Sequence, residues 1–165
     1  ASVGTLDLDG VPALAEAYTV AAGWEVDLSE HRSRVLTPGG VAAADLILGF
    51  EQTHVRHAVV DGAAAQSRAF TLGEFVRLLE GISEPVAGVT LVERARRRVA
   101  AAHDARGGVL GPLNTDELRD PFGRKRNVYR TVGDELRRLS LALAAGLFEV
   151  DPVRAVPVVE RPAVD

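Results

Sequence analysis

The chain has 165 residues, of which 47% are hydrophobic and 25% charged, so it fits one globular domain and not a disordered or fibrous segment. Its formal net charge of −4 gives no general electrostatic footprint for nucleic acid or an anionic membrane. The sequence contains no apolar run that could cross a bilayer and no cysteine. We therefore expect a cytoplasmic protein without disulfides, thiolate metal sites, a membrane partner or a nucleic-acid partner.

The first third of the chain alternates strand-like and helix-like segments, as α/β layer proteins do. Residues 1–5 are typical of the end of a β-strand, and an apolar stripe predicts a helix over 13–22. Thr37 supplies a cap and Pro38 stands at the first position of a short helix. The compact apolar run 45–50 then predicts a buried parallel strand.

The middle of the chain continues this alternation. We expect a helix over 51–59 and a short strand over 68–70. Thr71 and Glu74 have the spacing of a capping box, in which Thr71 accepts from the Glu74 backbone N–H and the Glu74 side chain reaches back. This pair is expected to open a helix over 75–80.

The segment 81–119 is interpreted as an inserted connection that carries one helix, over 91–102. The arginine-rich run 93–98 in that helix has two readings. It could bind an anionic partner, but at this net charge a solvated helix face is the better reading. A long amphipathic helix is predicted over 127–147, and the proline-rich tail 149–165 is expected to be irregular.

Five short motifs follow one another along the chain. They are Ser2-Val3-Gly4-Thr5 with Gly10-Val11-Pro12, the segment Asp27-Leu28-Ser29-Glu30-His31-Arg32-Ser33-Arg34 with Leu36-Thr37-Pro38, Ala44-Asp45-Leu46-Ile47-Leu48 with His54, Phe70-Thr71-Leu72-Gly73-Glu74-Phe75, and Asp120-Pro121-Phe122-Gly123 with Val128-Tyr129. In this order they resemble the low molecular weight protein tyrosine phosphatase family. The resemblance runs from Ser2 to about Leu147.

The resemblance implies an α/β fold: a three-layer sandwich around a small parallel sheet, which has four strands in the family. It also implies hydrolysis of phosphotyrosine proteins or small aryl phosphates in two steps, without a metal or a cofactor. A cysteine thiolate in a loop of pattern Cys, five residues, Arg attacks phosphorus, while backbone N–H groups and the arginine hold the phosphate oxygens. An aspartic acid from an Asp-Pro loop serves as general acid and then as general base.

In this chain the acid/base role falls on Asp120. Taken alone, an Asp-Pro pair more often simply breaks a loop before a helix, and the surrounding motifs are what favour the catalytic reading. Phe122 would then line the mouth of the substrate cleft and stack on a substrate ring, with plain loop packing as the rival.

Two further positions match supportive residues of the family. His31 would hydrogen-bond to the framework of the phosphate loop, and Ser2 would add a hydroxyl to the same network. His54 and His57 could present two imidazoles from one helix, but no third ligand is indicated. We therefore expect no metal site.

The family's first strand, phosphate loop and first helix have no counterpart here, because nothing but Ala1 precedes Ser2 and no nucleophilic cysteine is present. We interpret the chain as a fragment, an N-terminally incomplete phosphatase domain of bacterial type over 1–148 that is inactive as it stands. The alternative is a catalytically dead interaction module that binds a partner. Arsenate reduction on the same scaffold would need several thiols, which the sequence lacks.

Overall fold

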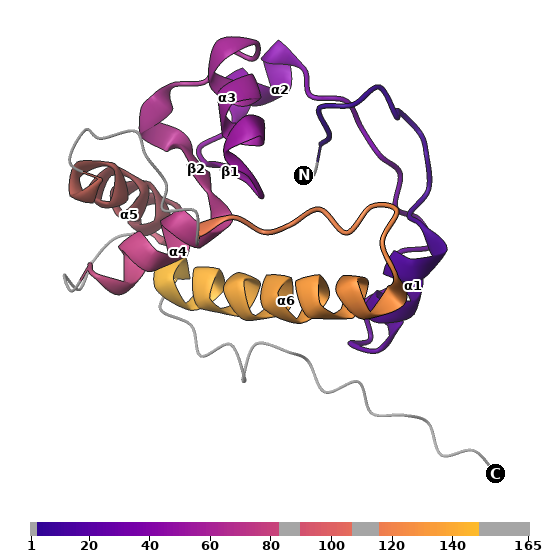
Figure 1. The fold of residues 1–165 in the computed structure, drawn as a ribbon. Coiled ribbons are helices and arrows are strands. Elements are labelled where there is room, and N and C mark those ends of the chain that lie inside the picture. The colour runs from indigo at the N-terminus through magenta and orange to yellow at the C-terminus, as the bar shows by residue number, and fades with distance from the viewer. Residues whose placement is uncertain (1–2, 83–89, 107–115, 149–165) are drawn as a thin grey trace.

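The computed structural model describes residues 3–82, 90–106 and 116–148. Figure 1 shows helices arranged around a short two-stranded sheet, with the longest helix below it. The elements are α1 (Ala15–Ala22), α2 (Pro38–Ala43), β1 (Ile47–Gly49), α3 (Gln52–Val60), the 3₁₀ helix η1 (Gln66–Arg68), β2 (Ala69–Thr71), α4 (Leu72–Glu80), α5 (Leu91–Ala105) and α6 (Arg126–Phe148). None of the helices in these ranges is long and apolar enough to span a membrane.

The sheet confirms the predicted parallel α/β class. β1 and β2 run parallel, with Leu48 opposite Phe70, and α3 and η1 form the connection between them. Successive strand residues face opposite sides of a sheet. Accordingly, Ile47 packs with α2 and α3 on one side, and Leu48 packs with α4 and α6 on the other. These helix layers on the two faces form the expected sandwich.

The predicted strand over 1–5 is wrong in its described part. Gly4 makes a single parallel bridge with Val35, in which the Gly4 N–H donates to Arg34 O and the Leu36 N–H donates to Gly4 O. The backbone bends at residues 5–7, so the pairing cannot continue into a ladder. Within the described residues, β1 therefore has one strand partner, β2.

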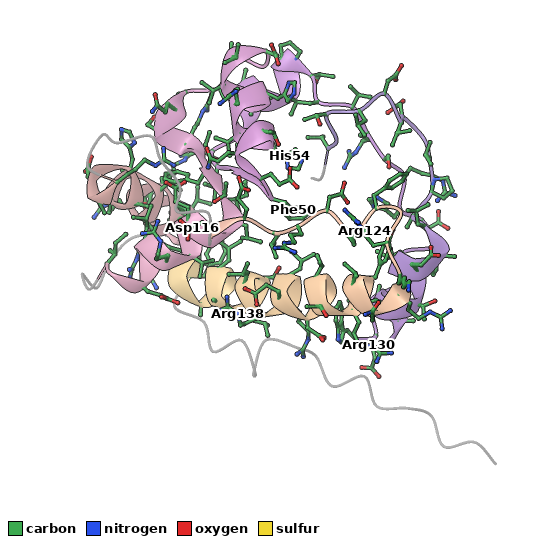
Figure 2. All side chains as sticks on the ribbon, viewed as in Figure 1. Phe50, His54, Asp116, Arg124, Arg130 and Arg138 are labelled. Atoms are coloured by element: carbon green, nitrogen blue, oxygen red, sulfur yellow. The ribbon has the colours of Figure 1, made fainter. Side chains whose placement is uncertain are left out.

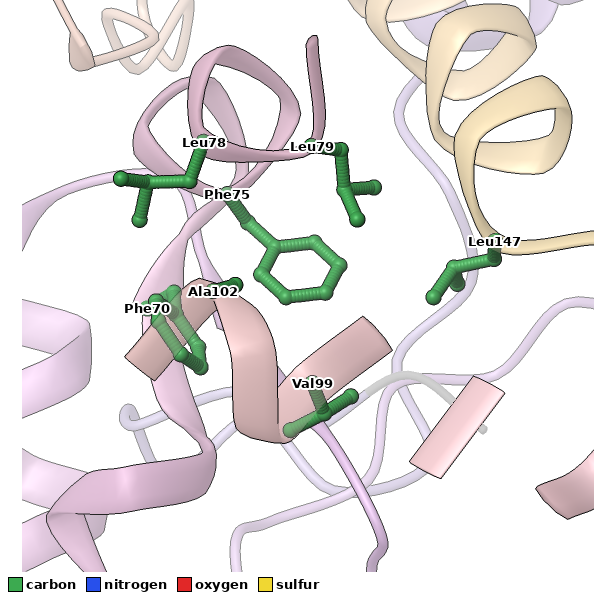
Figure 3. Packing of buried hydrophobic residues seen from close by; sticks show 7 residues of the cluster. All are labelled: Phe70, Phe75, Leu78, Leu79, Val99, Ala102 and Leu147. Atoms are coloured by element: carbon green, nitrogen blue, oxygen red, sulfur yellow. The ribbon is translucent and has the colours of Figure 1, made fainter. Parts of the chain in front are cut away.

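The main core lies where α4, α5 and α6 meet β2 (Figure 3). Phe70 and Phe75 are fully buried, and their ring centroids lie 4.9 Å apart at a tilted angle, a favourable aromatic arrangement. Val99 of α5 and Leu147 of α6 close the cluster from two other helices. The inserted segment 81–119 thus contributes part of the core through α5.

Thr71 caps α4 as predicted, because its hydroxyl accepts from the Glu74 N–H at 3.2 Å. The rest of the expected capping box is wrong, because the Glu74 side chain pairs with Arg106. Its Oε2 accepts from Arg106 Nη2 at 3.1 Å, and its Oε1 lies 3.0 Å from Arg106 Nε, in a direction poorly aligned for a hydrogen bond. Arg106 also lies 3.9 Å above the centre of the Phe70 ring. A buried charge is tolerated when it is paired, and this pair fastens the end of α5 to α4 and β2.

The arginines of α5 form the solvated face that the sequence favoured only in part, since Arg96 and Arg97 are exposed and the others reach neighbouring segments. Arg98 is buried and donates to Ile82 O at 2.9 Å, and Arg96 Nε donates to Asp45 Oδ1 at 3.0 Å. Arg94 Nη1 reaches Phe148 O at 3.5 Å. Much of this charge therefore holds α5 against neighbouring segments. The predicted tail 149–165 lies outside the described residues.

Candidate active site

The Asp120-Pro121 motif forms a tight exposed turn. Asp120 Oδ1 accepts from the Phe122 N–H at 2.9 Å, and the Arg124 N–H donates to Pro121 O at 2.9 Å. Gly123 has φ +70°, a backbone conformation that other residues rarely adopt. The turn therefore holds the Asp120 carboxyl group at the surface, where a substrate could reach it.

The residues before the turn fix it to the end of the sheet. The Leu118 N–H donates to Phe50 O at 2.9 Å, directly after β1, and Glu117 Oε1 accepts from the Gln52 N–H at 2.9 Å. The Leu118 side chain is buried against α4 and α6. In Figure 1 this segment runs from the α4 end of α6 to its α1 end. Asp120 therefore follows an anchor at the carboxyl end of β1, the end where open α/β sheets bind ligands.

Tyr129 supports the turn from the first turns of α6. Its ring is buried, and its pKa is raised by that burial and by the negative charges of Glu16 and Asp120, while a hydrogen bond from the Gly123 backbone N–H acts in the opposite direction. The raised pKa means that the phenol keeps its proton at neutral pH. The sequence analysis used Tyr129 only as part of a motif and missed this contact.

Two aromatic side chains are exposed near the anchored segment. Phe122 is 66% exposed in the turn itself, and Phe50 is 46% exposed at the end of β1. The exposure of Phe122 argues against simple loop packing, because a packed ring would be covered. Figure 2 shows Phe50 between the anchored segment and the N-terminal part of the chain.

His31 stands apart from this arrangement. It lies in a turn closed by its own N–H, which donates to Leu28 O at 3.0 Å, and its carbonyl accepts from Arg32 Nη1 at 2.7 Å. The described contacts do not join its ring to Asp120. Ser2, the other predicted supportive residue, lies outside the described residues.

The two histidines of α3 each have a local partner. His54 Nδ1 accepts from the Glu51 N–H at 3.3 Å in a capping box, and His57 Nδ1 lies 2.6 Å from Asp61 Oδ2. No cluster of metal-ligating side chains suited to an ion occurs in the described ranges.

A separate cavity of about 230 Å³ lies between α4, α6 and the start of the anchored segment. Four of its charged side chains form two ion pairs. Arg77 Nη2 donates to Asp116 Oδ2 at 2.8 Å, and Arg138 Nη2 donates to Glu135 Oε1 at 2.6 Å. These pairs leave little unmet hydrogen-bonding capacity for a ligand.

Comparison with known proteins gives one informative result. No family model and no curated protein matches the sequence. Among solved structures, the chain is similar to a low molecular weight protein tyrosine phosphatase from T. tengcongensis, with a TM-score of 0.59 and 25% sequence identity. The match covers 87% of this chain and 74% of the neighbour. The α/β fold of this chain is thus similar to that of a low molecular weight protein tyrosine phosphatase.

Proposed function

We propose that the chain belongs to the low molecular weight protein tyrosine phosphatase family and that its complete form hydrolyses phosphotyrosine or small aryl phosphates. The observation that carries this proposal is the exposed Asp120-Pro121 turn, anchored beside the carboxyl end of β1 through Leu118 and Phe50. The structural likeness to a phosphatase of this family supports it.

Asp120 would act twice in the reaction. In the first step a thiolate sulfur bonds to phosphorus, the bond from phosphorus to the phenolic oxygen breaks, and the protonated Asp120 carboxyl gives its proton to that oxygen. In the second step the Asp120 carboxylate takes a proton from a water molecule. The water oxygen then attacks phosphorus, and the sulfur leaves as thiolate with release of inorganic phosphate. The exposed turn suits both steps because it meets the leaving group from the solvent side.

The nucleophile must come from residues other than these, since the 165 residues contain no cysteine. We propose that a strand carrying the Cys, five residues, Arg loop pairs with the second edge of β1, which has no strand partner in the described part of the chain. Exposed apolar side chains in the N-terminal segment and directly after β1 favour such a cover. They include Val3, Leu6, Leu8 and Phe50.

Phe122 and His31 keep their proposed roles. The exposed Phe122 ring would stack on the phenyl group of a substrate. Such a contact between two aromatic rings is favourable in an offset or edge-on arrangement. His31 and Ser2 would support the phosphate loop once that loop is present. No nucleic-acid partner and no metal are part of the proposal.

A chimera tests this proposal. The first strand, phosphate loop and first helix of the T. tengcongensis neighbour are fused in front of Ala1, and hydrolysis of an aryl phosphate is measured. We expect activity in the chimera and none in the chain alone or in a chimera whose loop cysteine is replaced by serine. A chimera that folds, binds phosphate and shows no hydrolysis would contradict the proposal.

The second candidate is an interaction module without catalysis. One observation favours it: exposed cations beside the Asp120 turn have no ion-pair partner among the described residues, and these could bind a partner without any nucleophile. The chimera separates the two candidates, because an interaction module would gain no activity from the added segment.

A further inference from the structure

Four exposed cationic side chains lie at the start of α6, and we call them the basic cluster: Arg124, Lys125, Arg126 and Arg130. No ion pair to any of them occurs among the described residues. Some arginines elsewhere in the same ranges have carboxylate partners, as Arg77 does with Asp116 and Arg138 with Glu135. The cluster therefore presents unmet positive charge on a chain whose net charge is −4.

Folding does not explain this placement. The N-terminal end of a helix carries partial positive charge, so cations there are unfavourable and acids are favourable. Helices α1, α4 and α5 have Glu16, Glu74 and Glu93 in their first turns, whereas the first turns of α2, α3 and α6 have no acid. The dipole of α6 therefore does not favour a cation such as Arg126 at its first position.

The cluster is continuous with the candidate active site. The Arg124 N–H closes the turn onto Pro121 O at 2.9 Å, so Arg124 belongs to the turn that carries Asp120. Arg126 begins α6, and Arg130 follows one helical turn later. Figure 2 shows Arg124 beside the turn and Arg130 on the same end of α6. The exposed Phe122 ring adds an apolar contact next to these charges.

We propose that the basic cluster and Phe122 form a docking surface for an acidic segment of a protein substrate, next to the residue that carries the phosphate. Guanidinium groups bind carboxylates with paired hydrogen bonds, and a local positive patch steers an acidic partner toward the site. The identification of that partner as a substrate rests on the proposed function. A peptide suits the surface better than nucleic acid does, because four cations on an acidic chain neutralise few backbone phosphates.

The test measures binding to the chain as it is, by fluorescence anisotropy. The probe is a labelled peptide of alternating Glu and Ala with a central tyrosine and no phosphate, and the reference probe replaces each Glu by Gln. We expect the Glu peptide to bind and the Gln peptide to bind at least tenfold more weakly. Raising the salt concentration should weaken binding of the Glu peptide.

The variant R124E/R126E should weaken binding of the Glu peptide at least tenfold. The matched control R56E/R97E makes the same change in net charge at exposed positions of α3 and α5 and should change binding less than threefold. Folding of R124E/R126E is not at risk from the helix dipole, since acids suit that end of α6.

Three results would overturn the proposal: equal binding of the Glu and Gln peptides, equal loss in the two double variants, or tighter binding of single-stranded DNA than of the Glu peptide. The last result would assign the surface to nucleic acid. None of these outcomes bears on the proposed hydrolysis, because neither peptide contains phosphate. Conversely, an inactive chimera would leave this binding test unaffected.

Discussion

Asp120 is held by its neighbours on both sides. Leu118 ties the segment to Phe50 O, Gly123 allows the tight turn, and Tyr129 lies beneath it. The motif alone was enough to predict an exposed carboxyl group on a loop before α6. It could not predict the Tyr129 contact, because that contact depends on how α6 packs against the turn.

Tyr129 offers a test by titration. Its pKa is raised from the ordinary tyrosine value of about 10 by burial and by Glu16 and Asp120. In a Tyr18→Phe variant Tyr129 is the remaining tyrosine of the two, and its ultraviolet titration should have a midpoint above 10. A midpoint at or below that value would contradict the described packing of the phenol.

The same shift has a consequence for stability. A group whose pKa is raised by folding stabilises the folded state fully below its unfolded pKa, and that contribution is lost as the pH rises through its folded pKa. Stability measured by urea unfolding should therefore fall above about pH 10. The fall should be less steep in Tyr129→Phe, which has no proton to lose at this position.

The partner of the Glu74 side chain could not be predicted from the sequence. Its spacing from Thr71 predicted a local capping contact, but its carboxylate binds Arg106, which is 32 residues away in the chain. Local patterns reveal i to i+3 partners, whereas this pair exists only because α5 returns to α4.

The Glu74 and Arg106 pair should contribute strongly to stability. Glu74→Gln removes the charge opposite a buried guanidinium, and breaking such a pair costs about 3–5 kcal/mol. The control Glu80→Gln alters an exposed residue of the same helix and should cost within about 0.5 kcal/mol. Equal urea midpoints for the two variants would contradict the buried pair.

At the level of elements, strongly periodic segments were predicted well. The expected helix over 127–147 is observed as α6 (Arg126–Phe148), because its apolar stripe packs against α4 and α5. The expected strand over 1–5 was wrong in its described part, since a strand depends on a partner ladder and Gly4 has one bridged neighbour. The formation of a strand thus depends more on residues distant in the sequence than the formation of a helix does.

The contact between α4 and the anchored segment is unusually close at Gly73. A Cβ atom there would lie 2.5 Å from Asp116 O, which is backbone and cannot turn aside. Gly73→Ala should therefore push residues 116–118 away, at a cost of about 1–3 kcal/mol that outweighs the better helix propensity of alanine. Urea unfolding gives the cost, and faster hydrogen exchange at the Leu118 amide shows where the chain moved.

Gly81→Ala is the matched control for that substitution. Its Cβ would meet nothing closer than Leu78 O at 3.5 Å, and the backbone there has φ −84°. We expect it to be neutral or stabilising by up to about 1 kcal/mol. If both variants behaved alike, the close approach of α4 and Asp116 would be wrong.

At the scale of the whole molecule, the sandwich was predictable from the order of the motifs, and the structural neighbour has the same architecture over 87% of this chain. The basic cluster was not foreseen, because a composition with net charge −4 conceals a local concentration of cations. The contacts of the α5 arginines were not predicted for a related reason. The sequence shows that these residues are charged, but not which carbonyl or carboxylate group each side chain reaches.

The measurement that tests the central claim most directly is the dependence of the chimera's rate on the leaving group, with and without Asp120→Asn. An acid that protonates the phenolate matters most for a weakly acidic phenol and least for a nitrophenol, which leaves readily without a proton. We expect Asp120→Asn to slow hydrolysis of phenyl phosphate by about 10²–10⁴-fold and that of nitrophenyl phosphate much less. An equal, small effect on both substrates would show that Asp120 is not the general acid.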